Sequence, residues 1–259
     1  MKRFSYSDYI FNSVVKEFTQ KYRNSLLGSL WVIIYPVVLV LIYTIIFSNI
    51  LSSKFSFFDH KYSYSIYLCS GIIIWNYFSE LLMKTINIFL DNSEILKKVS
   101  VPRFLFLIII TIASTLNHLI MLVIFIVFLF IIGFLNNISI ADYLYVYIVT
   151  TFLALSLGFF LSMFNVFYRD IGHFMNVFIQ LWFWATPIVY VSDLIPSSLM
   201  FLMNLNPLYK IVEGYHQIFF LKNSIDWLSF THHIFLILLL ILSSLFLYKK
   251  TITDILDEI

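Results

Sequence analysis

The sequence predicts an all-α integral membrane protein with six transmembrane helices, an N-terminal amphipathic interface helix and re-entrant helices in the outer leaflet. Three observations support this fold class: the composition, a series of long apolar runs, and the uneven placement of Lys and Arg. The 259 residues are 61% hydrophobic and 12% charged, and the mean hydropathy is +0.93. Because soluble domains carry about 25% charged residues, the apolar runs indicate membrane spans.

The first element is an amphipathic helix over residues 7–23. Charged residues alternate there with apolar side chains at helical spacing, which are Phe11, Val14, Val15, Phe18 and Tyr22. This pattern predicts a helix that lies in the cytoplasmic membrane interface before the first span. We therefore divide the chain into an interface segment, residues 1–28, and a six-span domain, residues 29–259.

Six apolar runs follow, and a helix of about 20 residues is enough to cross the hydrocarbon core. The predicted spans are residues 29–50, 63–88, 104–134, 142–164, 172–191 and 232–248. The third run could be split into two spans. Because no Gly or Pro marks a turn near Asn117 and His118, we predict one long helix there.

Residues 193–222 interrupt the apolar pattern before the last span. Pro196, Pro207 and several polar residues stand among apolar ones, so this segment is too polar and too broken to face lipid across the whole bilayer. Irregular backbone at membrane depth is tolerated only where protein or water shields it. We predict short helices that re-enter the outer leaflet.

Lys and Arg set the orientation, because cytoplasmic loops carry an excess of them. With both termini in the cytoplasm, all but four of the 16 basic residues lie on or near that side; the four are Lys54, Lys61, Lys210 and Lys222. The distribution therefore favours this orientation.

The most polar interruption between two spans is the charged island, residues 91–103, with the sequence DNSEILKKVSVPR. Its charged residues surround an apolar centre, Ile95 and Leu96. A loop that only joined two spans would not need this pattern. A short amphipathic helix that fits a groove on another protein would have it, so we predict a cytoplasmic docking element.

Motifs for catalysis are missing from the sequence. None of the six Gly residues falls in a GxxxxGK[ST] spacing, so the chain cannot form an ATP-binding loop of that type. It also lacks HExxH, CxxC and paired-carboxylate clusters. His232 and His233 have no companion ligands, which favours an interfacial anchor over a metal site. We expect no metal and no cofactor in this chain.

Few ionisable side chains fall within the spans. Glu80 and Lys84 are spaced i,i+4 and are predicted to pair. His118 is either part of a proton relay or a histidine hydrogen-bonded between helices, and we favour the second. A proton-coupled secondary transporter would be expected to carry more such groups near the midplane.

Aromatic residues make up 20% of the chain. They act either as lipid-facing bulk and interfacial belts, or as the lining of a conduit for a sugar polymer, since aromatic faces stack on sugar rings. The candidates for the conduit are Trp31, Tyr35 and Tyr43 in the first span and Trp182, Trp184 and Tyr190 in the fifth.

Five segments resemble, in order along nearly the full chain, the membrane permease of type-2 ABC transporters that export polysaccharides. KYRNSLLGSLWVIIYPVVLVLIYTIIFS resembles the first span of that family and YSIYLCSGIIIWNYFSE the second. NVFYRDIGHF resembles the turn between spans four and five, LWFWATPIVY the fifth span, and LNPLYKIVEGYHQIFF the outer re-entrant segment. Each match alone is weak, but together they are specific, and they favour the transmembrane subunit of an O-antigen exporter over one for capsule or teichoic acid.

The resemblance implies a transport subunit and not an enzyme. It implies a homodimer in the bacterial inner membrane, bound to two copies of a separate ATP-binding subunit that holds ATP and Mg²⁺. The implied substrate is a glycan on a lipid pyrophosphate, with membrane lipid around the dimer and no nucleic acid. Coupling to the ATPase is assigned by position to Asn92, Glu94, Leu96, Lys97, Lys98, Pro102, Arg103, Arg169 and Asp170. Val101 departs from relatives with an aromatic residue there, which leaves the depth of docking open.

The pyrophosphate would need basic groups near the inner face, because charge is costly at the bilayer centre. Lys21 and Arg23 are the candidates, and anchoring to anionic lipid head groups is an equal alternative for them. Among other functions, a permease for a drug or a lipid fits the aromatic content less specifically. A membrane acyl- or glycosyltransferase would need an acid, base or metal cluster, and a scaffold would leave the charged island unexplained.

Overall fold

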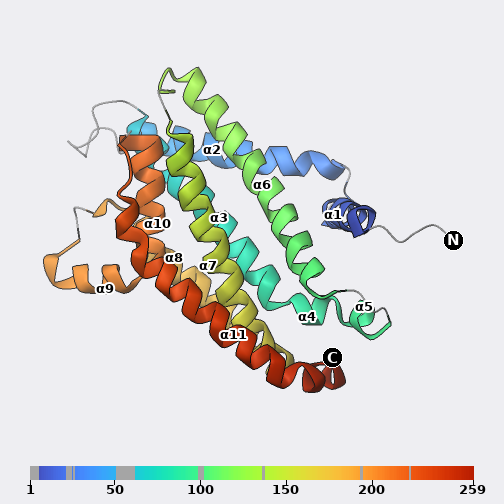
Figure 1. The fold of residues 1–259 in the computed structure, drawn as a ribbon. Coiled ribbons are helices and arrows are strands. Elements are labelled where there is room, and N and C mark those ends of the chain that lie inside the picture. Colours follow the sequence, from blue (N-terminus) through green and yellow to red (C-terminus); the bar gives the residue numbers. More distant parts are fainter. Residues whose placement is uncertain are drawn as a thin grey trace.

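The computed structural model describes residues 6–21, 25, 27–50, 62–98, 102–135, 138–192, 195–221 and 223–259. Within this part of the chain the regular structure is helical, as the sequence predicts. The long helices form an elongated bundle (Figure 1). One end of it, which we call the α5 end, carries α1 (Tyr6–Lys21), α4 (Ile88–Asp91), α5 (Ser93–Lys98) and the last turns of α11 (Thr231–Glu258).

Four helices of the described chain are long and apolar enough to cross a membrane. They are α3 (Ser63–Ile86), α6 (Phe104–Ile131), α7 (Ile140–Phe167) and α11, which is preceded by the turn η5 (Trp227–Phe230). The third apolar run is thus a single helix of 28 residues, as predicted. The four helices make the chain a multi-pass membrane protein.

The first and fifth predicted spans correspond to α2 (Trp31–Ile50) and α8 (Asp170–Trp184). The fifth was expected to run to residue 191, but α8 has only 15 residues. Pro187 explains the early end, because proline lacks an N–H and disfavours helical backbone in the residue before it. At 1.5 Å per residue α8 is about 22 Å long, shorter than a hydrocarbon core of about 30 Å.

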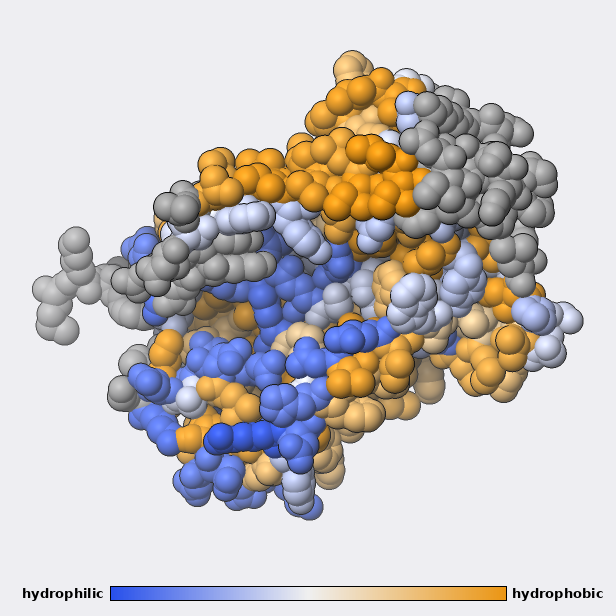
Figure 2. Space-filling model, turned by 180° about the vertical axis from the view of Figure 1, so that it is seen from behind, coloured by the Kyte–Doolittle hydropathy of each residue, from blue (hydrophilic) through white to orange (hydrophobic). Residues whose placement is uncertain are grey.

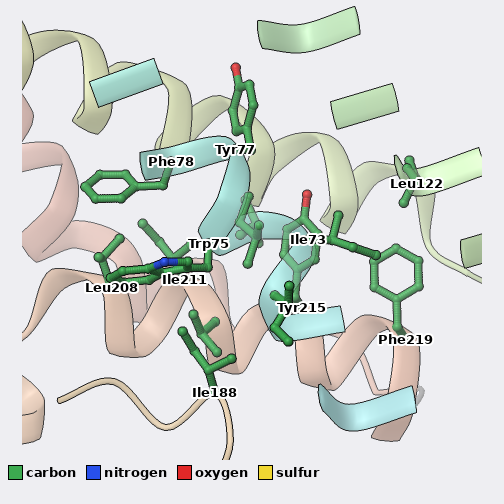
Figure 3. Packing of buried hydrophobic residues seen from close by; sticks show 14 of the residues in the cluster. Ile73, Trp75, Tyr77, Phe78, Leu122, Ile188, Leu208, Ile211, Tyr215 and Phe219 are labelled. Atoms are coloured by element: carbon green, nitrogen blue, oxygen red, sulfur yellow. The ribbon is translucent and has the colours of Figure 1, made fainter. Parts of the chain in front are cut away.

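Helix α3 lies at the centre of the bundle and is buried along most of its length. On one side it packs against α10 (Pro207–His216), where the side chains of Trp75 and Phe78 lie beside Leu208 and Ile211 (Figure 3). Tyr77 points away from α10, towards α7, and its hydroxyl is 2.8 Å from that of Thr151. The core of the bundle is therefore built around α3.

Helices α3 and α7 approach closely at Gly158. A Cβ atom at this position would lie 2.6 Å from Thr85 Cβ and 3.1 Å from the backbone oxygen of Leu82. Small residues allow such close approach between helices in membranes, where packing drives association. Gly158 therefore fixes the distance between the two helices at the α5 end.

The predicted amphipathic helix is present as α1, and it packs on α6. Val14 and Phe18 contact Ile109 and Ala113, whereas Phe11 is 68% exposed. Only one part of its apolar stripe is therefore covered by this chain.

The segment predicted to re-enter the outer leaflet does consist of short helices. In its described part they are η3 (Ser197–Leu199), α9 (Met200–Leu205), α10 and the π-helical turn η4 (Gln217–Leu221). Asn206 joins this segment to the end of α8: its Oδ1 accepts from Trp182 Nε1 at 2.8 Å, and its Nδ2 donates to Thr186 Oγ1 at 2.9 Å. The same Oδ1 caps α10 by accepting from the Leu208 N–H.

Candidate functional site

A cavity of about 850 Å³ opens between α1, α2, α3, α6 and α8. Figure 2 views this side of the molecule: the apolar α2 forms a ridge, and hydrophilic residues lie in the hollow beneath it. The cavity thus separates the two helices, α2 and α8, that correspond to the first and fifth predicted spans. We call it the α2–α8 cavity.

Amide side chains from three helices line the α2–α8 cavity. They are Asn76 on α3, Asn117 on α6, and Asn176 and Gln180 on α8. Asn176 and Gln180 are spaced i,i+4, so they share one face of α8. Sequence reasoning missed this set, although polar side chains at helical spacing within apolar runs were the available signal.

A charged cluster lies on the wall of this cavity nearest α1. Lys84 Nζ is 2.6 Å from Glu80 Oε1, so the predicted pair is confirmed, and it is also 2.5 Å from Glu17 Oε1. Asn117 Nδ2 donates to the same Glu80 oxygen at 2.7 Å. We call Glu17, Glu80 and Lys84 the Lys84 cluster. It connects α1 and α3, and through Asn117 it reaches α6.

We expect that replacing Glu17 with Gln weakens the attachment of α1. The ion pair to Lys84 is partly exposed, so its loss should cost about 0.5–1 kcal/mol. Hydrogen exchange of the α1 amides should accelerate about two- to fivefold. Lys16→Gln is the matched control, because Lys16 is exposed one residue away. An equal effect of both variants would contradict a specific role of the ion pair.

The predicted pathway aromatics fall into two groups. Trp31 and Tyr35 line the α2–α8 cavity. Trp182, Trp184 and Tyr190 gather instead at the end of α8 away from the α5 end, where the Tyr190 hydroxyl donates to the Trp184 carbonyl at 3.2 Å. These three are absent from the described lining of the cavity.

The remaining pathway residues are Tyr43, Lys21 and Arg23. Tyr43 is half-buried against the hydrophobic core, and its carbonyl accepts from Ser65 Oγ at 3.4 Å. The side chain of Lys21 and the whole of Arg23 lie outside the described residues. Their assignment to a phosphate group stays a prediction.

The charged island contains α5, whose six residues form the predicted short helix. Glu94 and Lys97 are exposed, whereas Asn92 is half-buried and donates from Nδ2 to the Ile88 carbonyl at 2.8 Å. Asp91 precedes them at the end of α4. Desolvation, and secondly the Glu17 carboxylate, raise the pKa of Asp91.

Three further residues of the island face the bundle. Leu96, Pro102 and Arg103 line an apolar cavity of about 670 Å³, and Arg103 Nη1 donates to the Tyr248 hydroxyl on α11 at 2.9 Å. The side chain of Lys98 and the whole of Val101 lie outside the described residues. The described part of the island is therefore anchored to the bundle through one face and exposed on the other.

Asn165, on α7, joins the end of α3 to the first turn of α8, next to the turn where Arg169 and Asp170 are exposed. It is 1% exposed. Its Nδ2 donates to Asn87 Oδ1 at 3.0 Å and to the Ile86 carbonyl at 3.3 Å, and its Oδ1 accepts from the Gly172 N–H at 2.8 Å. One buried side chain is thus bonded to residues that adjoin both predicted docking regions, and sequence reasoning gave it no role.

Two histidines make contacts that hold helices together. His118 is buried, and its Nε2 lies 3.1 Å from the Tyr143 hydroxyl and 3.2 Å from that of Tyr215. This confirms a histidine hydrogen-bonded between helices. His233 Nε2 lies 2.7 Å from the Pro207 carbonyl oxygen, which is an anchoring contact between α11 and α10.

Comparison with known protein families matches residues 9–220 to the family described as ABC-2 type transporter. Two similar proteins, each named O-antigen export system permease protein RfbA and each from Klebsiella pneumoniae, are 25% identical to this chain over 216 residues. The matched region covers 82% of this chain and 81% of each relative. The family match includes α1, the α2–α8 cavity and the charged island. The chain therefore belongs to the ABC-2 type transporter family and is a membrane-spanning transport subunit.

Proposed function

We propose that this chain is the permease subunit of an exporter that moves a lipid-linked O-antigen polysaccharide across the bacterial inner membrane. ATP hydrolysis takes place in a separate ATP-binding subunit, of which two copies bind a homodimer of this chain. The family supplies the transport role, and the names of the two relatives supply the class of substrate. The observation that carries the proposal is the α2–α8 cavity, because amides and aromatic rings on its wall suit a sugar polymer.

In this proposal the chain has six spans, with α2 and α8 added to the four long helices, and α10 re-enters the outer leaflet. Both termini are cytoplasmic, which agrees with the Lys and Arg distribution and with the position of α1 and the end of α11 at one end of the bundle (Figure 1). Helix α1 then lies in the inner interface, where its exposed Phe11 meets lipid.

The proposed docking surface for the ATP-binding subunit combines the exposed residues of α5 with the turn at Arg169 and Asp170. Closure of the partner upon ATP binding would move both regions together, because Asn165 bonds Asn87, at the end of α3, to Gly172, at the start of α8. The movement then separates α2 from α8 and widens the α2–α8 cavity.

Deletion of the gene in its host tests the proposed function. The expected result is the loss of surface O-antigen, with lipid-linked polysaccharide retained inside the cell. Restoration should require this chain together with its ATP-binding subunit. Unchanged surface O-antigen in the deletion strain would overturn the proposal.

Replacing Leu96 with Asp is expected to reduce export and co-purification of the ATP-binding subunit by about tenfold or more, which corresponds to about 1.4 kcal/mol. Leu96 packs against the cluster around Ile88 and Phe89, so a carboxylate there would release α5 from the bundle. Leu96→Met keeps the apolar contact and is the control. Wild-type co-purification of the Asp variant would remove α5 from the docking surface.

A further inference from the structure

The α2–α8 cavity combines two kinds of group that recognise sugars. Asn76, Asn117, Asn176 and Gln180 offer amide donors and acceptors, which match hydroxyl groups that can both donate and accept. Trp31 and Tyr35, which are 41% and 59% exposed, offer apolar ring surface at its α2 side. The amides are distributed over α3, α6 and α8, so a ligand between them can be contacted from several directions.

The charge of the wall restricts the ligand further. Among the described residues that line the cavity, those with a charged side chain at neutral pH are Glu17, Glu80 and Lys84. Both carboxylates bind the single ammonium group, so the Lys84 cluster carries a net negative charge. A ligand carboxylate or phosphate brought against this wall would be repelled, and Lys84 is already occupied by two partners.

We infer that the α2–α8 cavity is a binding site for uncharged sugar residues and selects against acidic glycans. This inference rests on the proposed function and adds the class of polysaccharide. Glu80 and the four amides bind sugar hydroxyls, and Trp31 and Tyr35 stack on the rings. The pyrophosphate of the lipid carrier binds elsewhere, nearer the membrane surface.

The position of the Lys84 cluster agrees with this division. Glu17 and Lys84 line the α2–α8 cavity and also a smaller cavity of about 390 Å³ that reaches Asp91 and Asn92 at the charged island. The cluster therefore forms the partition between the two cavities. Beyond the cluster the smaller cavity is lined by both Asp91 and Lys16, so the excess of negative charge that an anion would meet on this route lies at the Lys84 cluster itself.

The test uses the complete complex of this chain with its ATP-binding subunit in lipid nanodiscs. Two probes share one backbone: a glucose hexamer linked as in dextran, and the same hexamer after carboxymethylation. We expect the uncharged hexamer to bind on the order of tenfold more tightly than the carboxymethylated one, measured by titration calorimetry at low salt. Asn76→Ala combined with Gln180→Ala should weaken the binding of the uncharged hexamer by about tenfold. Asn204→Ala, at an exposed position of α9, should have no effect.

The charge variant gives an independent result. Glu80→Gln removes one carboxylate from the wall and leaves the pair of Glu17 and Lys84, so the preference for the uncharged hexamer should shrink by at least threefold, about half of the tenfold gap on a logarithmic scale. Equal or tighter binding of the charged hexamer to the wild type, no binding of either hexamer, or indifference to the cavity variants would overturn the inference.

Export in cells separates this failure from that of the proposed function. If the wild-type complex restores surface O-antigen while the hexamers contradict the expectation, only the inference about the cavity fails. If the complex restores no surface polysaccharide, the proposed function itself fails.

Discussion

Replacing Gly158 with Val is expected to leave almost no folded permease in the membrane. The Cβ position already lies 2.6 Å from Thr85 Cβ and 3.1 Å from the backbone oxygen of Leu82. A backbone atom cannot rotate away as a flexible side chain can, so α3 and α7 would have to separate. Overpacking of this kind costs on the order of 3 kcal/mol or more.

The measurement is the yield of monodisperse protein after detergent extraction, followed by its thermal unfolding. Ala141→Val is the matched control, because it adds a larger side chain at an exposed position of the same helix. A second variant that combines Gly158→Ala with Thr85→Gly moves the small residue to the opposite helix and should recover part of the yield. Normal yield of the Gly158→Val protein would show that the two helices can separate at little cost.

Replacing Asn165 with Leu is expected to uncouple ATP hydrolysis from export. Leucine keeps the branching at Cγ but cannot hydrogen-bond, so the Gly172 N–H and the Asn87 Oδ1 lose the amide that they contact, whereas Asn87 Nδ2 keeps its bond to the Met83 carbonyl. A buried polar group that loses its partner costs about 1–3 kcal/mol. The end of α3 and the start of α8 would then no longer be held at a fixed distance from each other. The complex should still assemble, because the exposed residues of α5 and of the α7–α8 turn are unchanged.

The readouts for Asn165 are the ATPase rate of the purified complex and the surface O-antigen in the same strain. We expect export to fall at least tenfold while the ATPase rate changes less than twofold. Asn165→Asp keeps an acceptor for Gly172 and should lie between the wild type and the Leu variant. A parallel fall of both activities in the Leu variant would indicate lost assembly and not lost coupling.

The fold could be predicted as far as it follows from the length of the apolar runs. The long apolar runs predicted α3, α6, α7 and α11, because a single segment in lipid satisfies its backbone hydrogen bonds internally by forming a helix. The end of α8 was misjudged because hydropathy continues through residue 191, while Pro187 stops the helix. Hydropathy reports partition into lipid, whereas helix ends depend on backbone hydrogen bonding.

The candidate site could be predicted only in part. The pair of Glu80 and Lys84 is local in sequence and was found, but Glu17 and Asn117 join it from helices far apart along the chain. Asn165 begins the NVFYRDIGHF segment, but the resemblance gave it no role, since one amide beside an apolar run has many explanations until its partners are known. Contacts between helices depend on how they rotate about their axes, and a single sequence constrains this rotation weakly.

The shortness of α8 has a consequence for the lipid around the chain. Phe174, Leu181 and Trp184 are exposed on a helix that falls about 8 Å short of an average hydrocarbon core. A bilayer that met this face would have to thin locally, and each ångström of hydrophobic mismatch carries an energetic penalty. In the proposed homodimer a second copy that covered this face would remove the mismatch, and the penalty that it removes grows with the thickness of the membrane.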